Sequence, residues 1–195
     1  MIDVVFDLEG GTIPAAYRSA LWGAVQRHAP QLAEERLVGV LPLRSSVNGQ
    51  GLLLAKRAKL VIRMPTELAE SAAANLTGQQ LDIAGSAMRV GSAKTRLIQP
   101  YPTIHALVAG SSDEVLFTED IRKQMMELGV TGKLICGKSF TINDDQRSIH
   151  GYSLVLHDLK PEASLQLQYT GLGDERQFGC GIFVHYKVIT GLSED

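Results

Sequence analysis

The hydrophobic and polar positions along the chain predict a mixture of strands and helices. Apolar residues alternate with polar ones where a half-buried strand is expected, and recur every three to four residues where an amphipathic helix is expected. In the first half these patterns predict a strand, a helix, two strands, a helix and a strand, over residues 2–8, 15–32, 36–43, 59–65, 66–76 and 86–98. Pro30 breaks the first helix and Thr66 can cap the second. The predicted order is therefore β-α-β-β-α-β.

The second half repeats this order. It predicts a strand, a helix, two strands, a helix and a strand, over residues 103–110, 113–129, 133–142, 147–156, 161–171 and 181–189. Ser111 and Glu114 can form a capping box before the first of these helices, and Pro161 begins the second. The sequence thus predicts an α+β fold of two tandem ferredoxin-like units. We expect the units to span residues 1–99 and 100–195, with a glycine-rich loop in the second.

Two glycine motifs look like nucleotide sites, but their surroundings argue against this function. Residues 132–139, GKLICGKS, match the phosphate-loop pattern G-x-x-x-x-G-K-[ST], yet they lie in a predicted strand that leads into a hairpin instead of a helix. Residues 171–176, GLGDER, begin like the dinucleotide fingerprint, but Arg176 replaces its third glycine and the segment follows a helix. We therefore expect neither an NTPase nor a dinucleotide-binding protein.

Composition and charge indicate a globular protein with one basic surface. Hydrophobic residues make up 45% and charged residues 21% of the 195 residues, and the net charge is −2. The positive charges are segregated, because residues 37–66 and 83–112 contain no acid. The acidic N-terminus does not look like a signal peptide, and no apolar run is long enough to cross a membrane. Cys136 and Cys180 suit free thiols in the cytoplasm, and no Cys or His spacing predicts a metal site.

The loop GLGDERQFGCGIF, residues 171–183, contains four glycines, namely Gly171, Gly173, Gly179 and Gly181. Such a loop either allows tight turns or presents backbone N–H groups to a phosphate chain without a helix terminus. Together with the two acid-free segments, the second interpretation predicts an RNA backbone as the ligand. A loop of this kind between the last helix and last strand of a second ferredoxin-like unit is also the feature that carries a family resemblance.

The chain resembles the CRISPR-associated endoribonucleases that process repeat RNA, which belong to the repeat-associated mysterious protein superfamily. The resemblance runs from DVVFDLEG through QRHAPQL, PYPTIH and HGYSLVLHDLKPEASLQLQ to GLGDERQFGCGIFVHYK. It implies CRISPR precursor RNA as the partner and cleavage without a metal or other cofactor. In this chemistry a 2′-hydroxyl attacks the adjacent phosphate, leaving a cyclic phosphate and a 5′-hydroxyl. Whether the enzyme stays on the repeat hairpin or joins other subunits of an effector complex is left open.

The resemblance also indicates catalytic residues. It places the catalytic histidine at the end of the first helix, where His28 stands, and a serine that orients the ribose near Ser139. Tyr169, just before the glycine-rich loop, either positions the histidine or packs its helix. RNA contacts are expected from the acid-free segments, the second-half hairpin and the glycine-rich loop, at Arg44, Lys56, Arg57, Lys138, Arg147, Gly171, Gly173, Arg176, Gly179 and Gly181.

Two other functions stay open at this point. One is a non-catalytic RNA-binding subunit of a CRISPR effector complex, in which His28 would be dispensable. The other is a ferredoxin-like module for a small molecule or a protein, in which the glycines only form turns. The chain also departs from the hairpin-binding members of the family, because its helix over residues 113–129 carries only Arg122 and Lys123 among five acids, where they have many arginines.

Overall fold

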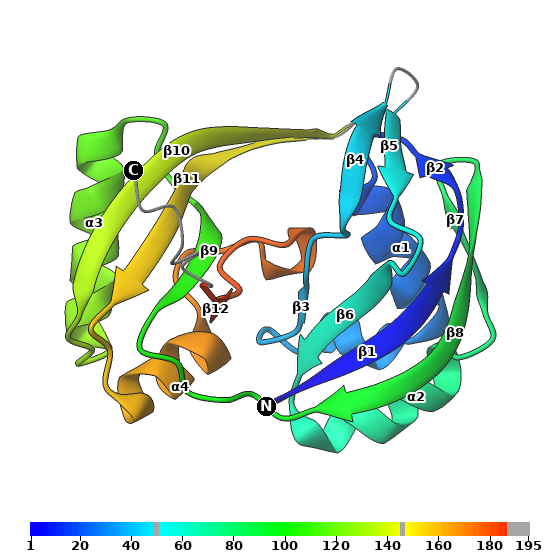
Figure 1. Ribbon diagram of the computed structural model, residues 1–195, viewed down its shortest axis with the longest axis horizontal. Helices are drawn as coiled ribbons and strands as arrows, with labels where there is room; N and C mark the ends of the chain where they lie inside the picture. The colour runs from blue at the N-terminus through cyan, green and yellow to red at the C-terminus, as the bar shows by residue number, and fades with distance from the viewer. Residues whose placement is uncertain (49–50, 145–146, 187–195) are drawn as a thin grey trace, which may run out of the picture.

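The N-terminal half is a five-stranded antiparallel sheet with two helices on one face. A computed structural model describes residues 1–48, 51–144 and 147–186. The sheet has the strand order β3-β6-β1-β8-β7, and α1 and α2 lie behind it in Figure 1. Its elements are β1 (Ile2–Glu9), α1 (Arg18–His28), η1 (Pro30–Glu34), β3 (Gly39–Val40), β6 (Lys59–Met64), η2 (Thr66–Leu68), α2 (Ala69–Leu76), β7 (Gln80–Ile83) and β8 (Ser86–Arg96). A small second sheet, β2-β5-β4, consists of β2 (Thr12–Ile13), β5 (Gly51–Leu54) and β4 (Ser45–Asn48).

The C-terminal half is a four-stranded antiparallel sheet with the order β10-β11-β9-β12. Its elements are β9 (Ile104–Ala109), α3 (Glu114–Glu127), β10 (Lys133–Asp144), β11 (Arg147–His157), α4 (Pro161–Thr170), η3 (Arg176–Phe178) and β12 (Val184–His185). The long β10–β11 hairpin reaches from this half across the top of the molecule toward the first half (Figure 1). No helix in the described part of the chain is long and apolar enough to cross a membrane.

The strand orders confirm the predicted α+β class. In chain order, β1, β3, β6 and β8 are the first to fourth strands of a β-α-β-β-α-β unit. Their order in the sheet, β3-β6-β1-β8, is therefore second, third, first and fourth. β9, β10, β11 and β12 lie in the same relative order in the other sheet. Both halves therefore arrange their strands as a ferredoxin-like unit does. β7 is an additional edge strand of the first sheet.

Several elements differ from their predicted bounds. The first helix spans Arg18–His28 and not residues 15–32, and the chain just before it forms strand β2 at Thr12–Ile13. Thr66 begins a 3₁₀ turn and does not cap the helix that follows. The N-cap of α3 is Asp113, whose carboxylate accepts the N–H groups of Val115 and Leu116, so the expected capping box is wrong.

The strand predictions were correct in place but not always in length. Only Gly39–Val40 of the predicted strand 36–43 pairs with β6. The closing strand is Val184–His185, and residues 187–189 of its predicted range lie outside the described residues. Residues 133–144 form a single strand, which confirms that the GKLICGKS motif does not form a phosphate loop.

Each half has its own hydrophobic core, and a third cluster joins the two. The N-terminal core lies between the sheet and α1 and α2, around Phe6, and the C-terminal core lies around Phe117 of α3. In the third cluster, Ile149 of the β10–β11 hairpin packs against Phe178 and Cys180 of the glycine-rich loop. Trp22 of α1 packs against both this cluster and the N-terminal core. The hairpin and the loop are therefore held against the first half.

Candidate functional site

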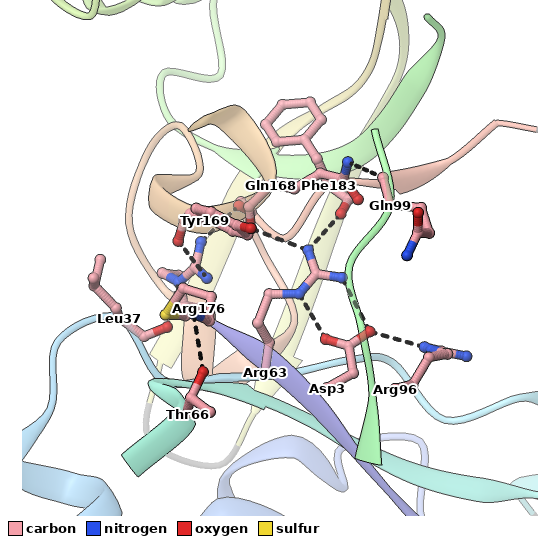
Figure 2. Close-up of polar contacts among 12 residues, drawn as sticks. Asp3, Leu37, Arg63, Thr66, Arg96, Gln99, Gln168, Tyr169, Arg176 and Phe183 are labelled. Carbon is pink, nitrogen blue, oxygen red and sulfur yellow. Dashed lines mark hydrogen bonds and ion pairs between the residues drawn. The ribbon is translucent and has the colours of Figure 1, made fainter. Parts of the chain in front are cut away.

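A buried ion pair joins β1 and β6 where the two halves meet. Arg63 on β6 lies opposite Asp3 on β1, and its side chain is 2% exposed. Its Nε and Nη2 donate to the two carboxylate oxygens of Asp3, at 2.7 and 3.2 Å. Arg96 on β8 reaches the same carboxylate at 2.9 Å, as Figure 2 shows. Burial alone would raise the pKa of Asp3, but hydrogen bonds and the positive charges of the two arginines hold it below its usual range.

The free side of Arg63 binds the C-terminal half. Its Nη1 donates to the carbonyl oxygen of Gln168 at 3.0 Å and to that of Phe183 at 2.6 Å. Gln168 lies in the last turn of α4, where backbone carbonyls have no partner within the helix and carry partial negative charge. A guanidinium group of the first half therefore caps a helix of the second.

Arg176 caps the same helix from the glycine-rich loop. Its Nη2 donates to the carbonyl of Tyr169 at 3.4 Å, while Nη1 donates to Gly181 at 3.1 Å and Nε to Leu37 at 3.2 Å (Figure 2). Its side chain is only 5% exposed, and burial followed by the charge of Arg63 lowers its pKa to about 10. Arg176 is therefore not free to contact RNA as expected, because its donors stabilise the loop and the contact between the halves.

The four loop glycines do not present free N–H groups, contrary to our expectation. Gly171 donates to the carbonyl of Leu167, the last-turn bond of α4, and Gly179 donates to Arg176. The N–H of Gly181 donates to Leu107 of β9 at 2.6 Å, and that of Gly173 donates to the side chain of Gln124 at 2.9 Å. A phosphate chain could bind these amides only by breaking hydrogen bonds within the protein.

The glycines are instead required by conformation and space. Gly171 and Gly181 have φ angles of 74° and 66°, in the left-handed region that side chains disfavour. A Cβ on Gly171 would overlap the carbonyl oxygen of Gly181, and one on Gly181 would lie 2.5 Å from the carbonyl oxygen of Leu172. The two ends of the loop thus approach so closely that only glycine fits.

A cleft of about 420 Å³ opens beside this loop. Its lining residues come from both halves and are Arg36, Leu37, Arg147, Thr170, Gly173, Asp174, Glu175, Arg176 and Gln177. Arg147, predicted to contact RNA, makes an ion pair with Glu175 in which one nitrogen, Nη1, donates to both carboxylate oxygens, at 2.9 and 2.8 Å. Its guanidinium also lies over the ring of Phe178, 4.5 Å from the centroid.

His28 is the last residue of α1, at the end of the helix that faces away from the glycine-rich loop. Arg18, at the first position of α1, is the residue that contacts the loop, through the carbonyl of Phe178. Ten residues at a rise of ~1.5 Å place His28 about 15 Å further along the helix axis. Its side chain is partly exposed and has no hydrogen bond or ion pair to any other described residue. The imidazole is therefore accessible to a ligand.

The other two catalytic candidates lie in the C-terminal half. Ser139 is exposed on β10, next to the exposed Lys138 and at a register shift in the pairing with β11. Tyr169 is half-buried in the last turn of α4, and its carbonyl accepts the bond from Arg176. Among the described residues, no hydrogen bond, ion pair or ring contact joins either of them to His28. The catalytic set expected from sequence thus comes from separate elements.

Arg44, Lys56 and Arg57 form a basic group at the base of the β4–β5 hairpin. The carbonyl of Arg44 accepts the N–H of Ala55, which brings the start of β4 next to the turn that holds the other two residues. All three side chains are exposed, and none has an ion pair with another described residue. They are therefore free to bind an anion.

Other cations of the acid-free segments are neutralised by acids from β1. Arg63 and Arg96 both bind Asp3, and Lys59 contacts Asp7. Sequence reasoning missed these pairs because each acid lies more than fifty residues away along the chain. It also missed Arg36, which is exposed and lines the cleft. Within the described residues, no group of three His, Cys, Asp or Glu side chains could hold a metal ion.

Comparison with known proteins identifies relatives along nearly the whole chain. Residues 2–188 match the sequence model of a family described as Cas6 Crispr. A curated relative from Myxococcus xanthus (strain DK1622), the CRISPR-associated endonuclease Cas6, is 31% identical over 186 residues. This match covers 94% of the present chain and 80% of the relative.

Solved structures share the fold at low sequence identity. A protein described as an RAMP protein binding different RNA substrates superposes with a TM-score of 0.72 at 12% identity, covering 94% of this chain and 98% of that one. A Cas6-related protein from Pyrococcus furiosus gives a TM-score of 0.70 at 15% identity, with 94% and 97% coverage. A CRISPR associated protein Cas6 gives 0.68 at 14% identity, with 95% and 99% coverage. Both halves of the chain therefore follow the arrangement seen in these proteins.

Proposed function

The chain belongs to the Cas6 family of CRISPR-associated endonucleases, and we propose that it cuts CRISPR precursor RNA within each repeat, without a metal, to release guide RNAs. The observation that carries this proposal is the family match over residues 2–188, together with 31% identity to a curated endonuclease over most of both chains. We further propose that the enzyme acts in the cytoplasm, where unpaired thiols such as Cys136 and Cys180 stay reduced.

The proposed reaction is an internal transesterification. The 2′-oxygen loses its proton and forms a bond to the adjacent phosphorus, while the bond from phosphorus to the 5′-oxygen breaks. The products are a 2′,3′-cyclic phosphate and a 5′-hydroxyl, whose oxygen takes up a proton. This chemistry needs one group that accepts or donates a proton at neutral pH, and histidine is the side chain that titrates nearest to it.

We assign the proton transfer to His28. Its imidazole is partly exposed at the end of α1 and is not engaged by another described side chain, so both ring nitrogens are available to an RNA strand. Arg27 precedes it and is exposed, which places a positive charge beside the same helix end. Ser139 and Tyr169 are proposed to position the ribose and the strand.

His150 is the alternative proton-transfer residue. It is exposed on β11, and its Nδ1 lies 3.1 Å from the hydroxyl of Thr141 on β10, so the ring is already held by the hairpin. We prefer His28, because the family resemblance places the catalytic histidine at the end of the first helix.

RNA is proposed to bind through the free cations of both halves. The group Arg44, Lys56 and Arg57 supplies three exposed charges in the first half, and Lys138 supplies another on the hairpin. Contacts to phosphates contribute most of the affinity in such interfaces and make it depend on salt. The glycine-rich loop shapes the junction of the halves, and its amides do not bind the phosphates directly.

Incubation with repeat RNA from the protein's own locus, in the presence of EDTA, tests the proposal. We expect one cut per repeat, with a cyclic phosphate on the upstream fragment that acid opens and a free 5′-hydroxyl that polynucleotide kinase labels. A scrambled RNA of equal length is the control. Cleavage that stops in EDTA would refute the metal-independent mechanism, and RNA bound but intact would identify a non-catalytic binding subunit.

A further inference from the structure

The cleft beside the glycine-rich loop contains an arginine that is bound by a carboxylate of the same chain. Arg147 lies at the start of β11, and Glu175 lies in the loop, 28 residues later. Their two hydrogen bonds, at 2.8 and 2.9 Å, both come from Nη1 of Arg147, so one guanidinium nitrogen contacts both oxygens of an anionic group, as it could also contact two oxygens of a phosphate. The pair is partly open to solvent, since the side chains are 44% and 27% exposed.

We propose that this cleft is a phosphate subsite for the RNA strand and that the carboxylate of Glu175 occupies the phosphate position while no RNA is bound. The inference rests on the proposed function, because it assumes an RNA substrate. An RNA phosphate replaces the carboxylate on Arg147 when the strand enters between the halves. Glu175 thus opposes RNA binding at this subsite.

The walls of the cleft favour an anion. Arg147 keeps its place by lying over the ring of Phe178, so its guanidinium stays oriented when the carboxylate leaves. Arg36 lines the cleft from the first half, is exposed and has no ion pair with another described residue. Arg176 forms part of the same wall with a buried charge. The cleft thus carries three positive charges against the two carboxylates of Glu175 and Asp174, and Arg147 and Arg36 are the ones that can contact a phosphate, because the N–H groups of Arg176 are bound to backbone carbonyls.

The backbone around Glu175 is fixed independently of its side chain. The carbonyl of Glu175 accepts the N–H groups of Phe178 at 3.0 Å and Cys180 at 3.1 Å. Its φ angle of 66° is unusual for a residue other than glycine and turns the chain so that the carboxylate meets Arg147. The carboxylate can therefore leave the arginine by side-chain rotation alone, while the loop keeps its shape.

Removing the negative charge of Glu175 should make Arg147 available to a phosphate without the cost of opening the ion pair. Opening an ion pair with this exposure corresponds to a factor of about two to five in an equilibrium constant. Glu175→Gln keeps the side-chain length and the backbone bonds, but its amide holds Arg147 less strongly. Asp174→Asn is a matched control, because it removes the same charge from the neighbouring residue of the cleft, which has no ion pair with Arg147 among the described residues.

The test measures affinity by fluorescence anisotropy, with repeat RNA carrying a 2′-deoxy nucleotide at the cleaved position, over a range of salt concentrations. We expect Glu175→Gln to bind about two- to fivefold more tightly than wild type, with a salt slope steeper by about one phosphate contact. Asp174→Asn should change the affinity by less than about twofold. Arg147→Met should bind more weakly, and Arg147→Met/Glu175→Gln should bind no more tightly than Arg147→Met alone.

Unchanged or weaker binding by Glu175→Gln would overturn the inference and make the pair a structural contact between hairpin and loop. An equal gain in Asp174→Asn, or a gain that persists without Arg147, would also overturn it, because the effect would then be one of general charge. Free inorganic phosphate that competes as well as RNA would indicate a site for a small anion instead. If wild type binds the RNA without cutting an unmodified copy, the proposed function fails, and the affinities still decide the role of Glu175.

Discussion

Replacing Arg63 by methionine tests whether the buried charge network holds the two halves together. The substitution keeps a long unbranched side chain but removes a guanidinium group that makes four hydrogen bonds, two to Asp3 and one each to the carbonyls of Gln168 and Phe183. Asp3 would remain buried with Arg96 as its remaining charged partner. Removing one partner from a buried ion pair costs about 3–5 kcal/mol, because the other charge is then incompletely compensated, and Arg96 is mostly exposed and compensates it only in part.

The loss should be measurable as a fall in melting temperature. For a chain of this size, each kcal/mol lowers the melting temperature by about 2–4 °C, which gives a fall of about 6–20 °C for Arg63→Met. Arg96→Met is the matched control. It removes the same group from the same carboxylate, but Arg96 is 56% exposed, so the loss should be about 1 kcal/mol or less. Calorimetry or circular dichroism at pH 7 would measure both variants. Equal falls for Arg63→Met and Arg96→Met would refute the reasoning, since burial would then not matter.

Four further outcomes are expected. Asp3→Asn should lower the melting temperature at pH 7. The pKa of Asp3 is lower in the folded than in the unfolded protein, so its ionised form stabilises the fold at any pH above the unfolded pKa. In thermal scans, the difference in melting temperature from wild type should therefore shrink as the pH falls below about 4. His28→Ala should slow cleavage about a hundredfold or more while binding and melting temperature stay unchanged; cleavage within about threefold of wild type would exclude His28 from proton transfer. Neutralising Lys56 and Arg57 together by glutamine should weaken RNA binding and flatten the salt slope by up to about two contacts, whereas a solvated strand edge would leave both unchanged. Gly171→Ala should destabilise the protein by more than about 1 kcal/mol in urea titrations, because its Cβ would overlap a backbone oxygen.

The fold class was predictable because each half buries one face of a sheet and one face of two helices. The alternation of apolar residues in β1, or the recurring apolar positions of α3, depends only on this burial. The small sheet β2-β5-β4 was not predicted. Its strands have two to four residues, and the run Leu52–Leu54 of β5 shows no alternation. Elements of this length depend on pairing partners that the local sequence does not reveal.

The candidate site was predictable only in part. Exposed cations such as Lys56 and Arg57 could be found from the absence of nearby acids. In the structure both are exposed, and neither has an ion pair with another described residue. Lys59 belongs to the same acid-free segment, yet it contacts Asp7 across a strand pair. The glycine-rich loop was recognised as a special segment, but its amides bind Leu107 and Gln124. The sequence shows which charged and polar groups exist, and only the tertiary structure determines which of them are already paired.

The capping of α4 by Arg63 makes the order of synthesis important. The two carbonyls that bind this guanidinium lie 105 and 120 residues further along the chain. When the N-terminal half leaves the ribosome, its sheet can form, but Arg63 has only Asp3 as a partner until residues 168–183 have been made. A chain that stops early therefore exposes a polar, incompletely paired surface where the second half should dock. The complete junction needs residues 168–183, so chains that end before them are the ones expected to stay open to proteases.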